Sequence, residues 1–386
     1  MKKVGIITIN DYQNYGNRLQ NYATQEVIKS LGFSVETIVN EPNKIIPTRK
    51  KYEFIKNINK LKNKPYEEIF SKVNDKISKK LFKSYTLQRI EVFKEFTKSH
   101  LLETNYTISE GNIPSKLSSE FDYFITGSDQ VWNPHFRNGS SVDFLNFAPK
   151  EKRIAYAPSF GIEEIPGDYI INYKKWLSEM HRLSVREKAG AKIIKDLTGR
   201  DAQVMVDPTL MLSKEKWLSI SSSPKNKPSQ PYLLTYFLGN KTKKLRAEIC
   251  NIAKEKNLKI INLVDISDKG TYVGGPSEFI DLINSASVFC TDSFHGVIFS
   301  MLMETPFVVF ERAGSLPSMN SRIETLLSTF KLESRLSKNI KNNDQVFNID
   351  YSHIGPILEN ERNKALVYLK EALQARETQD VLAKTN

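Results

Sequence analysis

Residues 4–39 read VGIITINDYQNYGNRLQNYATQEVIKSLGFSVETIV, and this stretch decides the fold class. Val4 to Ile9 form an apolar run typical of a buried strand. We expect a helix to begin at Asn17, a good N-cap residue, because apolar residues recur every four positions from Leu19 to Leu31. Phe33 to Val39 is again strand-like. The sequence therefore predicts a βαβ unit and a parallel sheet.

The same alternation continues along the chain in two series, separated by a Ser- and Pro-rich linker. Further strands are expected over 121–126, 153–157, 183–185, 204–206, 232–238, 259–263, 287–291 and 306–310, and helices over 169–180, 187–197, 242–256, 276–286, 295–303 and 356–376. This pattern predicts an α/β fold with two Rossmann-like domains facing across a cleft. The expected boundaries are 1–220 for the first domain, 221–231 for the linker, 232–355 for the second domain, and 356–386 for a C-terminal helix and tail.

Most of the positive charge lies in one segment. The 386 residues carry 56 Lys and Arg against 44 Asp and Glu, a formal net charge of +12, and residues 44–98 hold 16 of the former and 6 of the latter. This segment belongs to an expected helical insertion over about 42–100, and two interpretations stay open: a solvated Lys-rich helix face, or peripheral contact with an anionic membrane. No recognisable nucleic-acid motif accompanies it, so specific nucleic-acid binding is not expected.

The rest of the composition indicates a soluble protein. The apolar stretch 296–303 is far shorter than the ~18 residues that cross a bilayer. The apolar run after Met1 is too short for a secretory signal peptide. Cys250 and Cys290 are too few for a disulfide framework or a zinc cluster. We therefore expect a cytoplasmic protein, with the inner face of the membrane as an alternative location.

Candidate binding residues follow the carboxyl ends of the predicted strands, where parallel sheets bind ligands. They are Asn17 and Arg18; Ser128, Asp129 and Gln130; Arg186; Ser293, His295 and Gly296; Arg312; and Arg322. Cations, one histidine and amide-rich turns suit an anionic ligand. A G-x-G-x-x-G turn, a P-loop, a G-x-S-x-G elbow and metal-ligand spacing are all absent from the sequence, which argues against dehydrogenase, P-loop, hydrolase and metal chemistry.

Several of these residues also have a purely structural interpretation. Ser184 and Glu187 fit a capping box, with the side chain of Arg186 left free for a ligand. His295 begins a helix directly after a strand, inside the predicted crevice, which favours a functional role. Asp129 either contacts a ligand or makes an Asx turn. Asp207, followed by a proline, is interpreted as a turn residue.

Taken as a set and in this order, five motifs resemble those of the polysaccharide pyruvyl transferase family. They are NYGNRLQ at 14–20, GSDQVWN at 127–133, SVRE at 184–187, VDP at 206–208 and TDSFHG at 291–296. The resemblance implies a GT-B-like fold. It also implies transfer of the enolpyruvyl part of phosphoenolpyruvate onto two hydroxyls of a cell-surface sugar, as a ketal, with release of phosphate and without another cofactor. The acceptor implied is a saccharide, and a lipid-linked one is an alternative.

The resemblance also implies roles for individual residues. The catalytic histidine of the family maps onto His295, and an upstream arginine maps onto Arg186. The family carries an arginine two residues before the histidine, where this chain has Ser293. Either Arg312 or Arg322 takes its place, or the donor is held differently, or the activity has changed. The family also has a Gly-rich run where residues 127–130 read GSDQ, so the sugar-facing side is expected to differ.

These expectations combine into a mechanism. Arg186 and one of the two later arginines clamp the donor with help from the amides of Gly296 and its neighbours, and His295 protonates the donor's methylene carbon. Two alternatives stay open: a nucleotide-sugar glycosyltransferase of the same fold, and a non-catalytic scaffold bound to membranes through residues 44–98.

Overall fold

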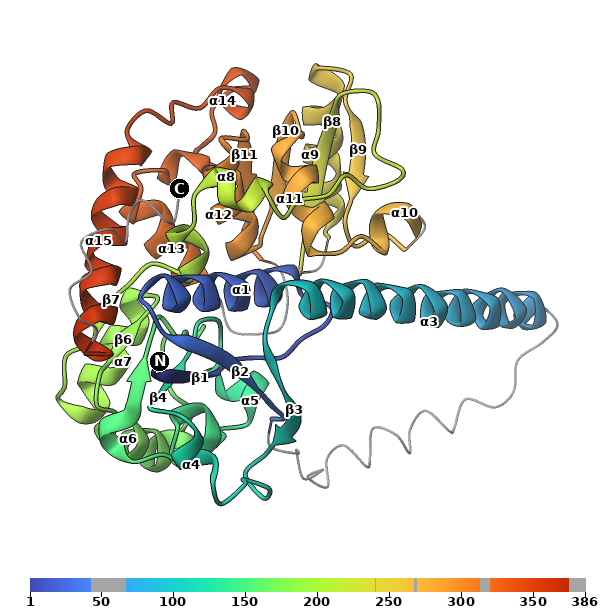
Figure 1. Ribbon diagram of the computed structural model, residues 1–386. Helices are drawn as coiled ribbons and strands as arrows, with labels where there is room; N and C mark the ends of the chain where they lie inside the picture. The colour runs from blue at the N-terminus through green and yellow to red at the C-terminus, as the bar shows by residue number, and fades with distance from the viewer. Residues whose placement is uncertain (43–66, 240, 267–268, 313–319, 375–386) are drawn as a thin grey trace.

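The structure, a computed structural model, describes residues 1–42, 67–239, 241–266, 269–312 and 320–374, and it consists of two lobes, each containing a parallel sheet (Figure 1). The α/β class with two Rossmann-like lobes is thereby confirmed.

The sheet of the first lobe has the strand order β3-β2-β1-β4-β5, with all strands parallel. Its strands are β1 (Lys3–Ile7), β2 (Ser34–Asn40), β3 (Glu103–Ile108), β4 (Tyr123–Thr126) and β5 (Arg153–Ala155). A parallel pair, β6 (Ser184–Val185) and β7 (Gln203–Val204), continues beyond β5 through a bridge between Ile154 and Arg182. The winding reverses between β1 and β4, which makes their carboxyl ends the switch point where such sheets bind ligands.

The expected helices of this lobe are present, one of them with a shifted start, and three short helices, α4, α5 and α8, were not expected. The helices are α1 (Tyr15–Ser30), α3 (Glu67–His100), α4 (Leu117–Glu120), α5 (Pro134–Arg137), α6 (Ile170–Ser178), α7 (Lys188–Thr198) and α8 (Lys214–Leu218), with 3-10 turns η1 (Ser141–Phe144), η2 (Lys150–Lys152), η3 (Gly167–Tyr169) and η4 (Pro208–Met211). The prediction that Asn17 caps α1 is wrong. Asn14 is the N-cap and accepts from the amide of Asn17, whose own side chain turns inward instead.

The Lys-rich insertion is partly described. Its second half is the single helix α3, which projects from the body of the molecule in Figure 1. Residues 43–66 lie outside the described residues, so the expected membrane contact through 44–98 stays a prediction. The strand β3 was not expected, and it forms the edge of the sheet beside β2.

The second lobe repeats the arrangement with the order β11-β10-β8-β9. Its strands are β8 (Tyr232–Tyr236), β9 (Lys259–Asn262), β10 (Val288–Thr291) and β11 (Phe307–Val309). The helices after β8 are α9 (Lys243–Glu255), α10 (Lys269–Tyr272), α11 (Pro276–Asn284), α12 (Phe294–Met303), α13 (Asn320–Thr329), α14 (Asn343–Phe347) and α15 (Ile354–Ala372), with 3-10 turns η5 (Glu333–Arg335) and η6 (Ser337–Asn339). The winding reverses between β8 and β10.

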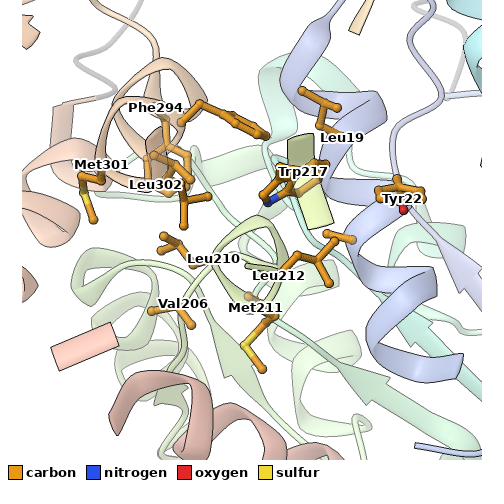
Figure 2. Close-up of a cluster of buried hydrophobic side chains, with 14 of the residues drawn as sticks. Leu19, Tyr22, Val206, Leu210, Met211, Leu212, Trp217, Phe294, Met301 and Leu302 are labelled. Carbon is orange, nitrogen blue, oxygen red and sulfur yellow. The ribbon is translucent and has the colours of Figure 1, made fainter. Parts of the chain in front are cut away.

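One apolar core joins the two lobes. It contains buried side chains from α1, η4 and α8 of the first lobe together with side chains from α11 and α12 of the second. Figure 2 shows Leu19, Tyr22, Leu210 and Trp217 in this cluster with Phe294 of α12. The ring of Trp217 lies 5.6 Å from that of Tyr22. The lobes are therefore packed on each other over much of the surface where they face.

The last helix returns to the first lobe. In Figure 1, α15 runs down the side of the molecule toward β6 and β7. Its Tyr368 hydroxyl donates to the carbonyl of Ala155 at 2.6 Å, and Arg362 donates from Nε to the carbonyl of Leu210 at 2.6 Å. Among the helices described, none has both the length and the apolar composition to span a membrane.

Candidate active site

The switch points of the two sheets face each other, and the first turns of α1 and α12 meet between them. α12 begins two residues after β10 and carries His295 in its first turn. A Cβ atom added to Gly16 of α1 would lie 2.0 Å from Nδ1 of His295. Because Gly16 has no side chain, the imidazole packs directly on the backbone of the other lobe. His295 is only 7% exposed.

Asp207 is the centre of the hydrogen-bond network at this contact. Its Oδ2 accepts from Nη1 of Arg186 at 2.7 Å, and the hydroxyl of Ser128 lies 2.9 Å from the same oxygen. Its Oδ1 accepts from both the amide and the hydroxyl of Thr209, at 3.0 and 2.7 Å. Nε2 of His295, from the other lobe, lies 3.5 Å from Oδ2. One carboxylate oxygen thus bonds Arg186 and lies beside His295, whose Nε2 has no hydrogen-bond partner among the described residues.

The charges around Asp207 determine its ionisation. Burial alone would raise the pKa of this carboxyl group, but the neighbouring charges of His295 and Arg186, together with the Thr209 amide, hold the pKa well below the ordinary value of 3.8. Asp207 is therefore a fixed negative charge inside the site, and it stabilises the positive charge of Arg186 beside it.

Arg186 is buried and only partly neutralised. It is 3% exposed, and its guanidinium carbon lies 4.2 Å from the ring centroid of Phe294, a cation–π contact between the lobes. Its Nη2 lies 3.7 Å from Oδ1 of Asp129, beyond hydrogen-bond distance. Among the described residues, no acceptor is bonded to its Nε or Nη2. These two nitrogens are available to a ligand.

Asp129 and its neighbours form the first-lobe side of the site. Asp129 has φ 64°, in the left-handed region, which Asp adopts more readily than most residues. Its Oδ2 accepts from Nδ2 of Asn17 at 3.3 Å, which ties the first turn of α1 to the loop after β4. Acidic groups are thus present, but within the described ranges no group of three or more His, Cys, Asp or Glu side chains could hold a metal ion.

Arg322 reaches the same region from α13. It is 5% exposed, and its guanidinium carbon lies 5.9 Å from the ring centroid of Phe294. Burial, followed by the like charge of Arg186, lowers the pKa of Arg322 to about 9. Arg186, Phe294 and Arg322 together line a cavity of about 30 Å³ between the lobes.

Two of the predicted cationic residues, Arg18 and Arg312, already contact other groups of the protein. Arg18 is fully buried, forms an ion pair with Glu103 at 2.7 Å, and donates to the carbonyl of Ile9 and to Asn17. Arg312 donates to the carbonyl of Asp292 at 3.1 Å, and its Nε lies 3.5 Å from the carboxylate of the same residue. The structure therefore ties both to neighbouring loops.

Three further predicted residues have structural contacts. Ser293 is the N-cap of α12, and its hydroxyl accepts from the amide of Gly296 at 3.3 Å. This amide already donates to the cap, so the expectation that it helps to clamp the donor stays a prediction. The side-chain oxygen of Gln130 accepts from Asn133 at 2.9 Å, and it lies against Gly161.

The capping box expected at residues 184–187 is not formed. Glu187 does precede α7, but its Oε1 accepts from the hydroxyl of Ser159 and from the amides of Phe160 and Gly161. The hydroxyl of Ser184 donates to the carbonyl of Ala155. Glu187 therefore holds the loop after β5. The spacing of Ser184 and Glu187 suggested a capping box, but the hydrogen-bond partners of Glu187 lie 26 to 28 residues away in the sequence.

The sequence reasoning missed two members of this site. Asp207 was interpreted as a turn residue, yet it connects both lobes. Phe294, the ring under both guanidinium groups, was not singled out at all. The signal available was position: Asp207 follows a strand end inside a quoted motif, and Phe294 directly precedes the candidate histidine.

Comparisons with known proteins add a family and a set of similar structures. A family model for polysaccharide pyruvyl transferases matches residues 14–314. No curated protein matches the chain. A glycosyltransferase structure from Rickettsia africae ESF-5 is 11% identical with a TM-score of 0.47, covering 97% of this chain and 99% of that one. The UDP-GlcNAc 2-epimerase of Neisseria meningitidis, bound to UDP-GlcNAc, is 10% identical with a TM-score of 0.43, covering 96% and 100%.

Proposed function

We propose, on the premise that this chain belongs to the polysaccharide pyruvyl transferase family, that it transfers the enolpyruvyl group of phosphoenolpyruvate onto two hydroxyls of a sugar in a cell-surface polysaccharide or its precursor. The product is a pyruvate ketal, and phosphate is released. The observation that carries the proposal is the convergence of His295 and Arg186, from opposite lobes, on one oxygen of Asp207.

The donor is a small trianion, so it requires several fixed cations. Arg186 offers Nε and Nη2, which have no hydrogen-bond partner among the described residues. Its Nη1 is held by Asp207, and its carbon lies over Phe294, so the guanidinium is oriented before the donor arrives. Each charge-assisted hydrogen bond to a carboxylate or phosphate contributes about 1.5–3 kcal/mol.

His295 is the proposed acid. The Asp207 carboxylate, 3.5 Å from Nε2, stabilises positive charge on the ring. The imidazolium gives its proton to the methylene carbon of the donor, the adjacent carbon becomes electrophilic, and one sugar hydroxyl adds to it. The C–O bond to phosphate breaks, and the second hydroxyl adds to the same carbon. Of the two hydroxyl protons, one restores the imidazolium and the other leaves with phosphate.

The sugar is proposed to lie beside the loops after β1 and β4. Asp129 and Gln130 carry side-chain oxygens that suit sugar hydroxyls, and Asn17 orients Asp129. No cofactor other than the donor enters this scheme, and the acceptor is a free or lipid-linked saccharide.

Mass spectrometry of candidate glycans incubated with phosphoenolpyruvate tests the proposal. We expect a pyruvate adduct with stoichiometric phosphate release, and a rate that falls ~10²–10⁴-fold in His295→Gln. His135→Gln is the matched control, because His135 is exposed and lies outside the site. The proposal fails if His295→Gln releases phosphate at the normal rate, or if nucleotide sugars stabilise the protein against heat and phosphoenolpyruvate does not.

A further inference from the structure

The cavity between the lobes has a cationic end and an apolar remainder. Its volume is about 30 Å³. Arg186 and Asp207 come from the strand ends of the first lobe, and Phe294, Arg322 and Thr325 come from α12 and α13 of the second. The other walls are mainly apolar, with Thr329 and Glu361 as further polar residues, and the Glu361 carboxylate pairs with Lys364 at 2.5 Å.

Both arginines carry donors without acceptors. Nε and Nη2 of Arg186 and Nε of Arg322 have no hydrogen-bond partner among the residues that the structure describes. The two side chains are 3% and 5% exposed, so bulk water reaches them poorly. A buried polar group without a partner destabilises a fold by about 1–3 kcal/mol, and by more when it is charged. Natural folds rarely leave three such donors together, and a ligand that supplies acceptors explains them.

The arrangement of charge points to an anion. Asp207 takes one nitrogen of Arg186, and no carboxylate among the described residues forms an ion pair with Arg322. The two guanidinium carbons lie 4.2 and 5.9 Å from the ring centroid of Phe294, so both groups lie beside the same ring. The like charge of Arg186 contributes to the lowered pKa of Arg322, and an anion between them would remove that repulsion.

Arg312, the other candidate for a second-lobe cation at this site, already contacts protein groups. The guanidinium of Arg312 contacts both the backbone carbonyl and the carboxylate of Asp292. The residue directly before Phe294 is Ser293, whose hydroxyl caps α12 and carries no charge. Arg322 is therefore the second-lobe cation that is placed to meet a ligand beside Arg186.

We propose that Arg322 and Arg186 form a binding subsite for one tetrahedral oxyanion, the phosphate dianion, over the ring of Phe294. Two planar guanidinium groups suit the several oxygens of phosphate, each able to donate two parallel hydrogen bonds. The phosphate belongs either to a phosphate ester or to free inorganic phosphate. This inference rests on the proposed function only for the source of the phosphate, which would be the donor before the reaction and the product after it.

Calorimetric titration of the full chain with inorganic phosphate, and separately with phosphoenolpyruvate, tests the subsite. We expect phosphate alone to bind, and Arg322→Gln to bind it about 10- to 100-fold more weakly. Arg322→Lys keeps the charge but lacks the planar guanidinium group, so its affinity for phosphate should lie between those of the wild type and Arg322→Gln. Arg246→Gln removes an exposed charge from α9 and controls for net charge.

Thermal unfolding in phosphate-free buffer separates ligand binding from a structural role. Because the Nε of Arg322 has no hydrogen-bond partner and no carboxylate among the described residues forms an ion pair with this side chain, Arg322→Gln should unfold at the same temperature as the wild type or higher, while losing the stabilisation by phosphate. A marked fall in the melting temperature without phosphate would overturn the inference. So would unchanged phosphate affinity in Arg322→Gln, a loss of affinity in Arg312→Gln instead, or no binding by the wild type up to ~10 mM phosphate.

The two proposals fail separately. If Arg322→Gln loses phosphate affinity and the wild type forms no ketal from phosphoenolpyruvate, the subsite stands and the proposed function is wrong. If the wild type forms the ketal and Arg322→Gln binds phosphate normally, the function stands and the subsite is wrong.

Discussion

Asp207→Asn is expected to lower the free energy of unfolding by about 3–5 kcal/mol at neutral pH. The carboxylate is 1% exposed and forms a buried ion pair with Arg186, which is itself 3% exposed. Asparagine keeps one acceptor oxygen, so either Arg186 or Thr209 loses its partner, and the guanidinium stays buried without its counter-ion. Breaking one side of such a pair costs more than the pair contributes, which sets the magnitude.

The same substitution should change how stability depends on pH. The pKa of Asp207 is lowered in the folded protein, so its stabilising effect is complete above the ordinary value of 3.8 and is lost as the pH falls below it. The gap between wild type and Asp207→Asn should therefore narrow on acidification from about pH 7 to about pH 3. Urea unfolding followed by tryptophan fluorescence measures this, since Trp217 lies in the core that joins the lobes.

Asp143→Asn is the matched control. Asp143 forms a buried ion pair with Arg137 at 2.8 Å inside the first lobe. Burial is the largest effect there and raises the pKa of Asp143, so its contribution is favourable at low pH and is lost as the pH rises. The gap between this variant and the wild type should change in the opposite direction with pH. A stability loss below about 1 kcal/mol for Asp207→Asn, or a gap that is the same at both pH values, would refute the reasoning.

Three further substitutions test other contacts. Gly16→Ala should displace His295, because the new methyl group would lie 2.0 Å from Nδ1; activity should fall, whereas Gly111→Ala, which enters open space, should leave it unchanged. Leu210→Ala should lower the free energy of unfolding by about 2–5 kcal/mol in urea, because the side chain is fully buried between the lobes; a value below about 1 kcal/mol would contradict that packing. Ser293→Ala should cost about 0.5–2 kcal/mol through loss of the α12 cap, and equal stability in a thermal melt would count against the cap.

Regular elements were predictable because their signals are local. Apolar runs located most strands to within two residues, since strands covered on both faces need continuous apolar sequence. The N-cap of α1 was misplaced by three residues, because Asn14 and Asn17 are both good caps and only the folded loop selects between them. The edge strand β3 lacked such a run: its sequence is ETNYTI, with only two of six residues buried.

The site was predictable in its position but not in its pairings. His295 and Arg186 were expected together because both follow strand ends at facing edges. Asp207 could not be recognised from spacing, since its partners lie 21 and 79 residues away in the sequence. Arg18 shows the converse: it occupies a strand end, but its partner Glu103 comes from the unexpected strand β3. Position along the chain indicates where charges gather, and only the folded structure shows which of them neutralise one another.

The apolar core between the lobes bears on how substrates enter. Swinging the lobes apart would expose side chains such as Trp217, Leu210 and Tyr22 to water, at roughly 1.5–3 kcal/mol for each one fully exposed. Interfaces that are large and apolar do not hinge freely. We therefore expect saccharides to approach through rearrangement of the strand-end loops, with the spacing of the two sheets unchanged. The width of the gap, set when the chain folds, would then limit the thickness of glycan that can be modified.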